Sequence, residues 1–220
     1  MNSPARSLFP RWRWVALAWL LVYLPSYSLT YGAANFLFLC NIAVALTCVG
    51  LWRGSALLLS SQALSSLLVD GVWALDFLSR LLAGRHLIGG TEYMFDARWP
   101  LFTRLLSLYH LALPGLFLAW LRRTGYDRRA YALQSLIALL AVCAGRLAGR
   151  EKNINFAFVD PILKRSFEPA PIHVAVIVGG LVLIVYPLTA SVLSRLYAPP
   201  AGRDDRPAAG SSMDARSGPS

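Results

Sequence analysis

Long apolar runs, separated by short polar or charged stretches, dominate the chain. Six of these runs are long enough, at about 20 residues each, for a helix to cross a lipid bilayer. They cover residues 14–31, 35–52, 55–78, 101–121, 130–147 and 173–193. The pattern therefore predicts an all-α polytopic membrane protein, a bundle of six transmembrane helices.

The composition supports a membrane protein and excludes a separate soluble catalytic domain. Hydrophobic residues make up 56% of the 220 residues and charged residues 15%, whereas about 25% of a typical soluble domain is charged. We expect a single transmembrane domain over residues 1–197. Residues 198–220 are rich in Pro, Gly, Ser, Asp and Arg, and this composition predicts a disordered tail.

The first apolar run has two interpretations. Basic residues precede it and small residues at 32–34 follow it, as in a secretory signal peptide. The run is long, however, and it carries Tyr23, Tyr27 and Tyr31, which are unusual in the short apolar region of a signal peptide. We therefore interpret it as a membrane helix that stays in the protein.

The positive charge points to membrane lipids as partners. The formal net charge is +10, and excess arginine in a membrane protein is typical of cytoplasmic retention and contact with anionic headgroups. No module that combines aromatic and basic residues for nucleic-acid binding is present in the sequence, so no nucleic acid is expected as a partner.

The distribution of arginine predicts the orientation. Six spans place both termini on one side, and a small majority of the 21 basic residues fall on that side, including the arginine-rich loop 122–129. We expect a multi-pass protein of the cell membrane with cytoplasmic termini. The two longest loops, 79–100 and 148–172, then lie on the other side, and long loops of this kind tend to carry function.

One predicted helix carries a stripe of polar residues. The stripe consists of Gln62, Ser66, Asp70, Trp73 and Asp76. At 100° per residue they span an arc of about 120°. An aspartate near the bilayer centre costs about 2.5–3.5 kcal/mol to insert, so this face should point inward, toward a cavity or a partner. For Asp76, the alternative is an ordinary helical ion pair with Arg80 at the membrane interface.

Two other apolar runs contain residues capable of chemistry. The run 35–52 contains Cys40 and Asn41, and the run 101–121 contains His110 followed by Pro114, which should kink the helix. A histidine within a span suggests function. The alternative is a structural hydrogen bond from this histidine to another helix, with Asp70 or Gln62 as the acceptor.

The two long loops add further candidates. The first contains Glu92 and Tyr93 close to Gly89 and Gly90, a composition that suits a lid over a cavity, and the second contains Asn155. Neither the acidic and histidine residues of the loops nor the three cysteines show the spacing of a metal site. No metal or cofactor is expected.

Four short stretches occur in an order that resembles a known family. They are Phe38-Leu39-Cys40-Asn41, the segment 62–70, Leu108-Tyr109-His110 and Asn153-Ile154-Asn155-Phe156. Together they resemble the YwaF-like integral membrane proteins of bacteria, which are related to an animal family of ether-phospholipid acyltransferases. More distant relatives are intramembrane hydrolases of fatty acid esters.

The resemblance implies a cysteine nucleophile and a histidine base, which map onto Cys40 and His110. Two positions depart from the family pattern: Asn35-Phe36-Leu37 replaces a Pro-Leu sequence before the cysteine, and Leu111 replaces a glycine after the histidine. A thiol becomes a strong nucleophile when a base removes its proton. The base needs a third group to orient it, and Asp70 is the candidate.

The sequence leaves open whether the protein is an enzyme. The first hypothesis is an intramembrane lipid acyltransferase or acyl hydrolase that uses the catalytic residues Cys40, His110 and Asp70. The second is a non-enzymatic protein that binds or transports a small molecule or lipid, and the third is a scaffold. Candidate substrate-binding residues are Asn41, Gln62, Trp73, Asp76, Glu92, Tyr93 and Asn155.

Overall fold

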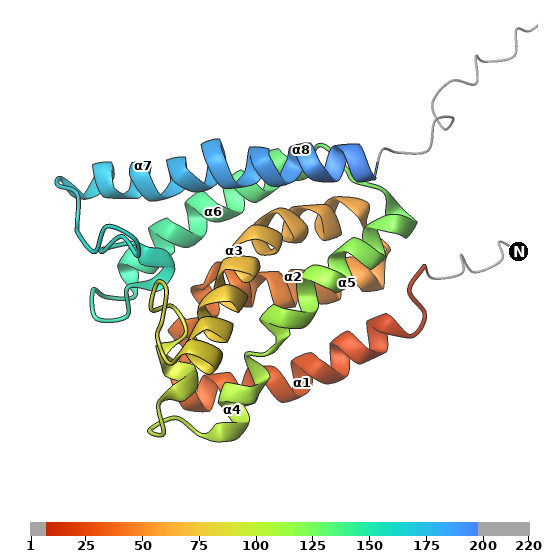
Figure 1. Cartoon of the computed structure of the whole chain (residues 1–220). Coiled ribbons are helices and arrows are strands. Elements are labelled where there is room, and N and C mark those ends of the chain that lie inside the picture. The colour runs from red at the N-terminus through yellow and green to blue at the C-terminus, as the bar shows by residue number, and fades with distance from the viewer. Residues whose placement is uncertain (1–7, 198–220) are drawn as a thin grey trace, which may run out of the picture.

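The chain forms a helical bundle (Figure 1), and the computed structural model describes residues 8–197. Its α-helices are α1 (Trp12–Tyr31), α2 (Leu39–Arg53), α3 (Ala56–Ala83), α4 (Leu101–Leu106), α5 (Tyr109–Thr124), α6 (Ala130–Leu147), α7 (Ala170–Gly180) and α8 (Tyr186–Leu196). Short 3-10 turns are η1 (Ala33–Leu37), η2 (Glu92–Phe95) and η3 (Ile154–Phe156), and a π-helical turn, η4 (Leu181–Val185), joins α7 to α8. Residues 8–197 contain no strand, and the all-α prediction is confirmed.

The eight α-helices group into six helical units, because α4 continues into α5 and α7 continues into α8. Four of the six units are long and apolar enough to cross a membrane. The four are α3, the α4–α5 unit Leu101–Thr124, α6 and the α7–α8 unit Ala170–Leu196. Helix α2 is apolar but only 15 residues long, and η1 extends it at its N-terminal end. The protein is an all-α membrane bundle. The predicted tail 198–220 lies outside the described residues.

Helix α3 is the centre of the bundle. It packs against α2, α5, α6 and α8, while α1 and the α7–α8 unit lie on opposite sides of the molecule (Figure 1). The predicted inward stripe is confirmed: Gln62 is 0% exposed and Asp70 1%, whereas Leu75 on the opposite face is 61% exposed. The polar face of α3 therefore points into protein and its apolar face points outward.

The two long loops lie together at the end of the bundle opposite the described ends of the chain (Figure 1). The Lys164 ammonium joins them by donating to the Ile88 carbonyl at 2.9 Å. At the other end, the Tyr126 amide donates to the Tyr197 carbonyl at 3.0 Å. This arrangement agrees with the predicted placement of the loops.

The predicted helix 35–52 is interrupted at Phe38, which corrects the sequence interpretation. Phe38 has an extended backbone (φ −63°, ψ 136°), so α2 begins at Leu39. The Asn155 side chain stabilises this start: its Oδ1 accepts from the Leu39 amide at 2.8 Å, and its Nδ2 donates to the Leu37 carbonyl at 2.7 Å. The interruption places Cys40 in the first turn of a helix that begins inside the protein.

A second interruption divides the predicted helix 101–121. Helix α4 ends at Leu106, and the backbone turns through Ser107 and Leu108 before α5 begins at Tyr109. The break therefore lies before Pro114, where the sequence predicted a kink. Pro114 lies inside α5 and has no N–H to donate to the His110 carbonyl one turn earlier. Because α5 begins at Tyr109, His110 lies in the first turn of a helix, as Cys40 does.

Replacing Asn155 is expected to destabilise the protein. Asn155→Ala removes the partners of the Leu39 amide and of the Leu37 and Ala141 carbonyls, which should cost about 2–3 kcal/mol. That loss corresponds to a decrease of about 5–10 °C in Tm, measured by thermal unfolding in detergent. Asn155 has φ 51°, a conformation that glycine adopts more easily than alanine. Asn155→Gly therefore removes the side chain without straining the backbone and is the matched control. A Tm of Asn155→Gly equal to that of the wild type would show that the side-chain hydrogen bonds contribute nothing.

Candidate active site

A buried histidine–aspartate pair joins α5 to α3. The His110 Nδ1–H donates to Asp70 Oδ1 at 2.7 Å, and both residues are buried, with exposed fractions of 6% and 1%. The sequence named Asp70 as a hydrogen-bond partner of His110 under both interpretations, as the group that orients a base and as a structural link between helices, and the bond is present. A proton on Nδ1 leaves Nε2 as the basic nitrogen of the ring.

Two aromatic rings hold the imidazole in place. The Trp73 ring stacks on His110 with a centroid distance of 4.7 Å, and the Tyr109 ring stacks on it at 4.1 Å. Together with the bond to Asp70, these contacts fix both the tautomer and the plane of the ring. Trp73 was predicted as a substrate-binding residue, and the structure places it against the candidate base.

The Cys40 thiol and the Tyr109 hydroxyl both donate to Asn41 Oδ1, at 3.6 Å and 3.2 Å, and the Tyr109 ring stacks on His110. Among the described residues, the bond to Asn41 is the only hydrogen bond of the thiol, and none joins it to His110. Cys40 is partly exposed, whereas His110 is buried. The two helices that carry Cys40 and His110 both pack on α3, which carries Asp70. The dyad of Cys40 and His110 stays a prediction.

Asn41 holds the site together from inside. Its Oδ1 accepts from the Tyr23 hydroxyl and, at 3.2 Å, from the Tyr109 hydroxyl, while its Nδ2 donates to the Asn35 carbonyl. Its amide N–H₂ group is thus already used for structure. We interpret Asn41 as a positioning residue and not as a direct contact to substrate.

The sequence interpretation missed the tyrosines of α1 as part of this site. Tyr23 bonds to Asn41, and the Tyr27 hydroxyl forms a hydrogen bond with the Ser107 hydroxyl. Both tyrosines are buried, at 0% and 4% exposure. The available signal was their spacing of four residues within an apolar run, which places both hydroxyl groups on one helix face.

One buried oxygen of the site has unused hydrogen-bond capacity. Asp70 Oδ2 is buried and has no hydrogen-bond partner among the described residues. An unpaired buried oxygen of this kind costs about 1–3 kcal/mol. Such atoms are commonly satisfied by water or by a bound molecule.

Gln62 belongs to a different polar cluster. Its Nε2 donates to Ser61 Oγ at 2.8 Å and to Gln134 Oε1 at 3.4 Å, and Gln134 in turn donates to the Tyr186 hydroxyl. Gln62 precedes Asp70 by eight residues, about 12 Å along an α-helix. The structure therefore separates Gln62 from the candidate centre, and its hydrogen bonds join α3 to α6 and, through Gln134, to α8.

Asp76 organises the first long loop. Its Oδ1 accepts from the amides of Leu87, Ile88 and Gly89, and its Oδ2 accepts from the amide and hydroxyl of Thr91. The proposed helical ion pair with Arg80 is not formed, because Arg80 instead donates to the Gly84 carbonyl. Both carboxylate oxygens are used by the loop, so Asp76 acts through structure.

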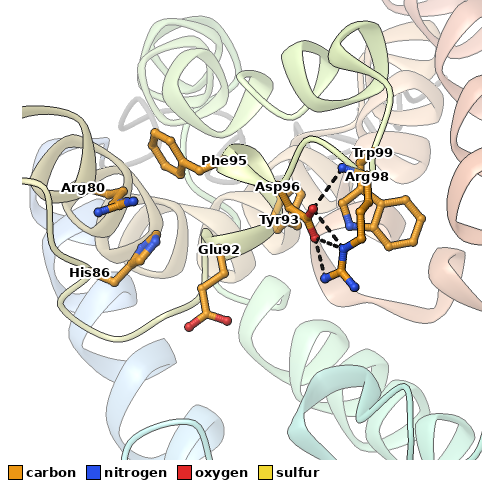
Figure 2. Close-up of a pocket in the computed structure, with 8 residues that line it drawn as sticks. All are labelled: Arg80, His86, Glu92, Tyr93, Phe95, Asp96, Arg98 and Trp99. Carbon is orange, nitrogen blue, oxygen red and sulfur yellow. Dashed lines mark hydrogen bonds and ion pairs between the residues drawn. The ribbon is translucent and has the colours of Figure 1, made fainter.

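The loop also forms a cavity at the end of the bundle, which we call the outer vestibule. It has a volume of about 490 Å³ and is lined by Arg80, His86, Glu92, Tyr93, Phe95, Asp96, Arg98 and Trp99 (Figure 2). Glu92 is exposed, and Arg98 forms an ion pair with Asp96 at 2.7 Å, which holds the pKa of that carboxyl below its usual range. The structure thus places Glu92 and Tyr93 in this vestibule.

A second cavity, which we call the apolar groove, lies between α1, α2 and α5. It has a volume of about 330 Å³ and is lined almost entirely by apolar side chains. Trp12 and Trp120 lie at one end of the groove and Tyr109 at the other. Because the Tyr109 ring stacks on His110 and its hydroxyl bonds to the same Asn41 oxygen as the Cys40 thiol, the groove ends beside the candidate centre.

Within residues 8–197, no three His, Cys, Asp or Glu side chains are grouped in a way that would hold a metal ion.

Comparison with protein-family models, curated proteins and solved structures gives no significant match to this chain. The functional argument therefore depends on the geometry of the candidate site.

Proposed function

We propose that the protein is an intramembrane enzyme that transfers or hydrolyses a lipid acyl group through a thioester on Cys40. The observation that carries the proposal is the buried bond between Asp70 and His110, with the Cys40 thiol linked to the imidazole through Asn41 and Tyr109. A histidine–aspartate pair that only joined two helices would need nothing beyond this hydrogen bond. The partly exposed thiol and the doubly stacked ring add a nucleophile and a fixed base. We also propose a relationship to the YwaF-like proteins, because the sequence resemblance includes the same residues.

The chemistry follows from the roles of the three residues. His110 Nε2 accepts the thiol proton, and Cys40 Sγ attacks the carbonyl carbon of an ester. The alcohol part leaves with the proton from His110, and the acyl group remains on sulfur as a thioester. Asp70 keeps the proton on Nδ1 and stabilises the imidazolium that forms during the attack.

The apolar groove suits the acyl part of a membrane lipid. Its wall is apolar and its inner end lies at Tyr109, whose hydroxyl bonds to the same Asn41 oxygen as the Cys40 thiol. A chain seated there would bring its carbonyl to the centre without entering water. We further propose that the bundle lies in the cell membrane with the arginine-rich 122–129 side in the cytoplasm.

A lipid assay with purified protein tests the proposal. We expect wild-type protein in vesicles of mixed phospholipids to release fatty acid or to form new acyl lipids over time, detected by mass spectrometry. Cys40→Ala should be inactive, and Cys143→Ala should be active, because Cys143 is exposed on α6. If Cys40→Ala matches the wild type, or if wild-type protein changes no lipid, the binding or transport hypothesis replaces the enzymatic one.

A further inference from the structure

Two charged side chains that line the outer vestibule have no ionic partner. Four residues of its wall carry a formal charge, and two of them, Arg98 and Asp96, pair with each other at 2.7 Å. The other two are Arg80 and Glu92, and neither forms an ion pair within residues 8–197. Among the described residues, the cavity thus presents one unpaired cation and one unpaired anion.

The Arg80 guanidinium is held against the wall of the cavity. Its Nη1 donates to the carbonyl of Gly84, the residue that ends α3, and its carbon lies 5.6 Å from the centre of the Phe95 ring. The Phe95 ring stacks in turn on Phe77 of α3 at a centroid distance of 5.6 Å. The bond to Gly84 is the only hydrogen bond of the guanidinium among the described residues. Its other N–H groups can therefore donate to an anionic group of a ligand.

His86 packs on the same ring as Arg80. The imidazole meets Phe95 edge to face at a centroid distance of 5.7 Å. Its Nδ1 lies 3.2 Å from Asp76 Oδ2 and 3.1 Å from Thr91 Oγ1, and the Thr91 hydroxyl itself donates to Asp76. Both neighbours of Nδ1 therefore act as acceptors, and the proton lies on Nδ1. In the described part of the chain Nε2 has no partner, so it is available to a molecule in the cavity.

Glu92 supplies the opposite charge. It is the first residue of η2, and its side chain lines the cavity and is exposed. Figure 2 shows its carboxylate apart from the Arg80 guanidinium. The Lys164 ammonium of the second long loop donates to the Ile88 carbonyl at 2.9 Å and forms no ion pair with Glu92. The carboxylate can therefore accept from a cationic group of a ligand.

The backbone that carries these side chains is fixed. Asp76 of α3 accepts from four amides of the loop 87–91. The Arg104 guanidinium of α4 donates to the Met94 carbonyl of η2 at 2.9 Å. The loop and the turn thus have set positions relative to the bundle, and a preformed site of this kind loses little conformational entropy when it binds a small molecule.

We propose that the outer vestibule binds a free aromatic amino acid. Arg80 and His86 bind its carboxylate, Glu92 binds its ammonium group, and the aromatic rings of the wall contact its side chain. The apolar part of the wall consists of three rings, Tyr93, Phe95 and Trp99, which suits one aromatic group. A volume of about 490 Å³ is within the range of small-molecule sites. This site does not depend on the proposed acyl chemistry.

Calorimetric titration of the purified full-length protein in a neutral detergent tests the site with three probes. L-phenylalanine carries both charges, 2-phenylethylamine lacks the carboxylate, and 3-phenylpropionate lacks the ammonium group. We expect wild-type protein to bind L-phenylalanine at least about tenfold more tightly than either analogue, because each analogue leaves one charge of the site unpaired.

Two variants should change this preference in opposite ways. Arg80→Gln should bind L-phenylalanine and 2-phenylethylamine equally, whereas Glu92→Gln should bind L-phenylalanine and 3-phenylpropionate equally. A general loss of structure would not produce this pattern. The matched controls are Arg85→Gln and Glu151→Gln, because both residues are exposed and neither lines the cavity. Both controls should keep the wild-type preference.

Three results would overturn the proposal. The first is that folded wild-type protein does not bind L-phenylalanine at millimolar concentrations, and the second is that both variants keep the wild-type preference. The third uses sn-glycero-3-phosphoethanolamine, which combines an ammonium group with a phosphate. If this probe binds more tightly than L-phenylalanine, the charges serve a lipid headgroup and not an amino acid. Binding of L-phenylalanine by a protein that transfers no acyl group would support the site and would contradict only the proposed function.

Discussion

Asp70→Asn is expected to lower the rate of acyl transfer by about 10³–10⁴-fold while the protein remains folded. The Asp70 carboxylate accepts a hydrogen bond from the His110 Nδ1–H. An asparagine amide offers a donor as well as an acceptor, so it can hold the imidazole with the proton on the wrong nitrogen. It also lacks the charge that stabilises the imidazolium.

The control for Asp70→Asn is a neighbouring buried residue of the same helix. Ser66 lies one turn before Asp70 and is also buried. We expect the Ser66→Ala variant to keep the rate of acyl transfer within a few-fold of the wild type. Thermal unfolding of both variants checks that the bundle is intact. An Asp70→Asn protein that is folded and transfers acyl groups within about fivefold of the wild-type rate would contradict the role of Asp70.

His110→Ala is expected to slow the alkylation of Cys40 by about 10²-fold. The probe is an iodoacetamide with a long alkyl chain, which enters from the lipid. In the proposed mechanism, the His110 imidazole accepts the proton of the Cys40 thiol, and only the thiolate reacts with the probe. Peptide mass spectrometry measures the modification of each cysteine over time.

Cys143 is an internal control within each sample. It is exposed on α6, and its alkylation should have the same rate in wild type and His110→Ala. A His110→Gln variant, closer in volume to histidine, separates the loss of the base from a change in packing. If Cys40 reacts equally fast in all three proteins, His110 is not its base.

The sequence predicted the features of this fold that follow from helical periodicity. Asp70 and Gln62 lie on the inner face of α3 because apolar residues occupy the opposite face, and the membrane position of the protein forces polar residues inward. The sequence named Asp70 and Gln62 as the acceptors available to His110 on this face, and in the structure the bond goes to Asp70.

The breaks in the helices were not predictable from local sequence. Phe38 and Leu108 are not helix breakers, and the start of α2 depends on Asn155, which is 116 residues from Leu39 along the chain. Asp76 was predicted as a cavity residue or an ion pair, but its bonds to the 87–91 backbone depend on the path of a loop. Contacts between segments distant in sequence decided these features.

The most direct test of the central claim is the intact mass of the protein after incubation with vesicles that contain one defined ester lipid. We predict a species heavier than the free protein by one acyl group, located on Cys40 by peptide mapping and removed by neutral hydroxylamine, as expected for a thioester. The adduct should be present in Cys143→Ala and absent from Cys40→Ala. An adduct that maps to Cys48 or Cys143, or that persists in Cys40→Ala, would contradict the account.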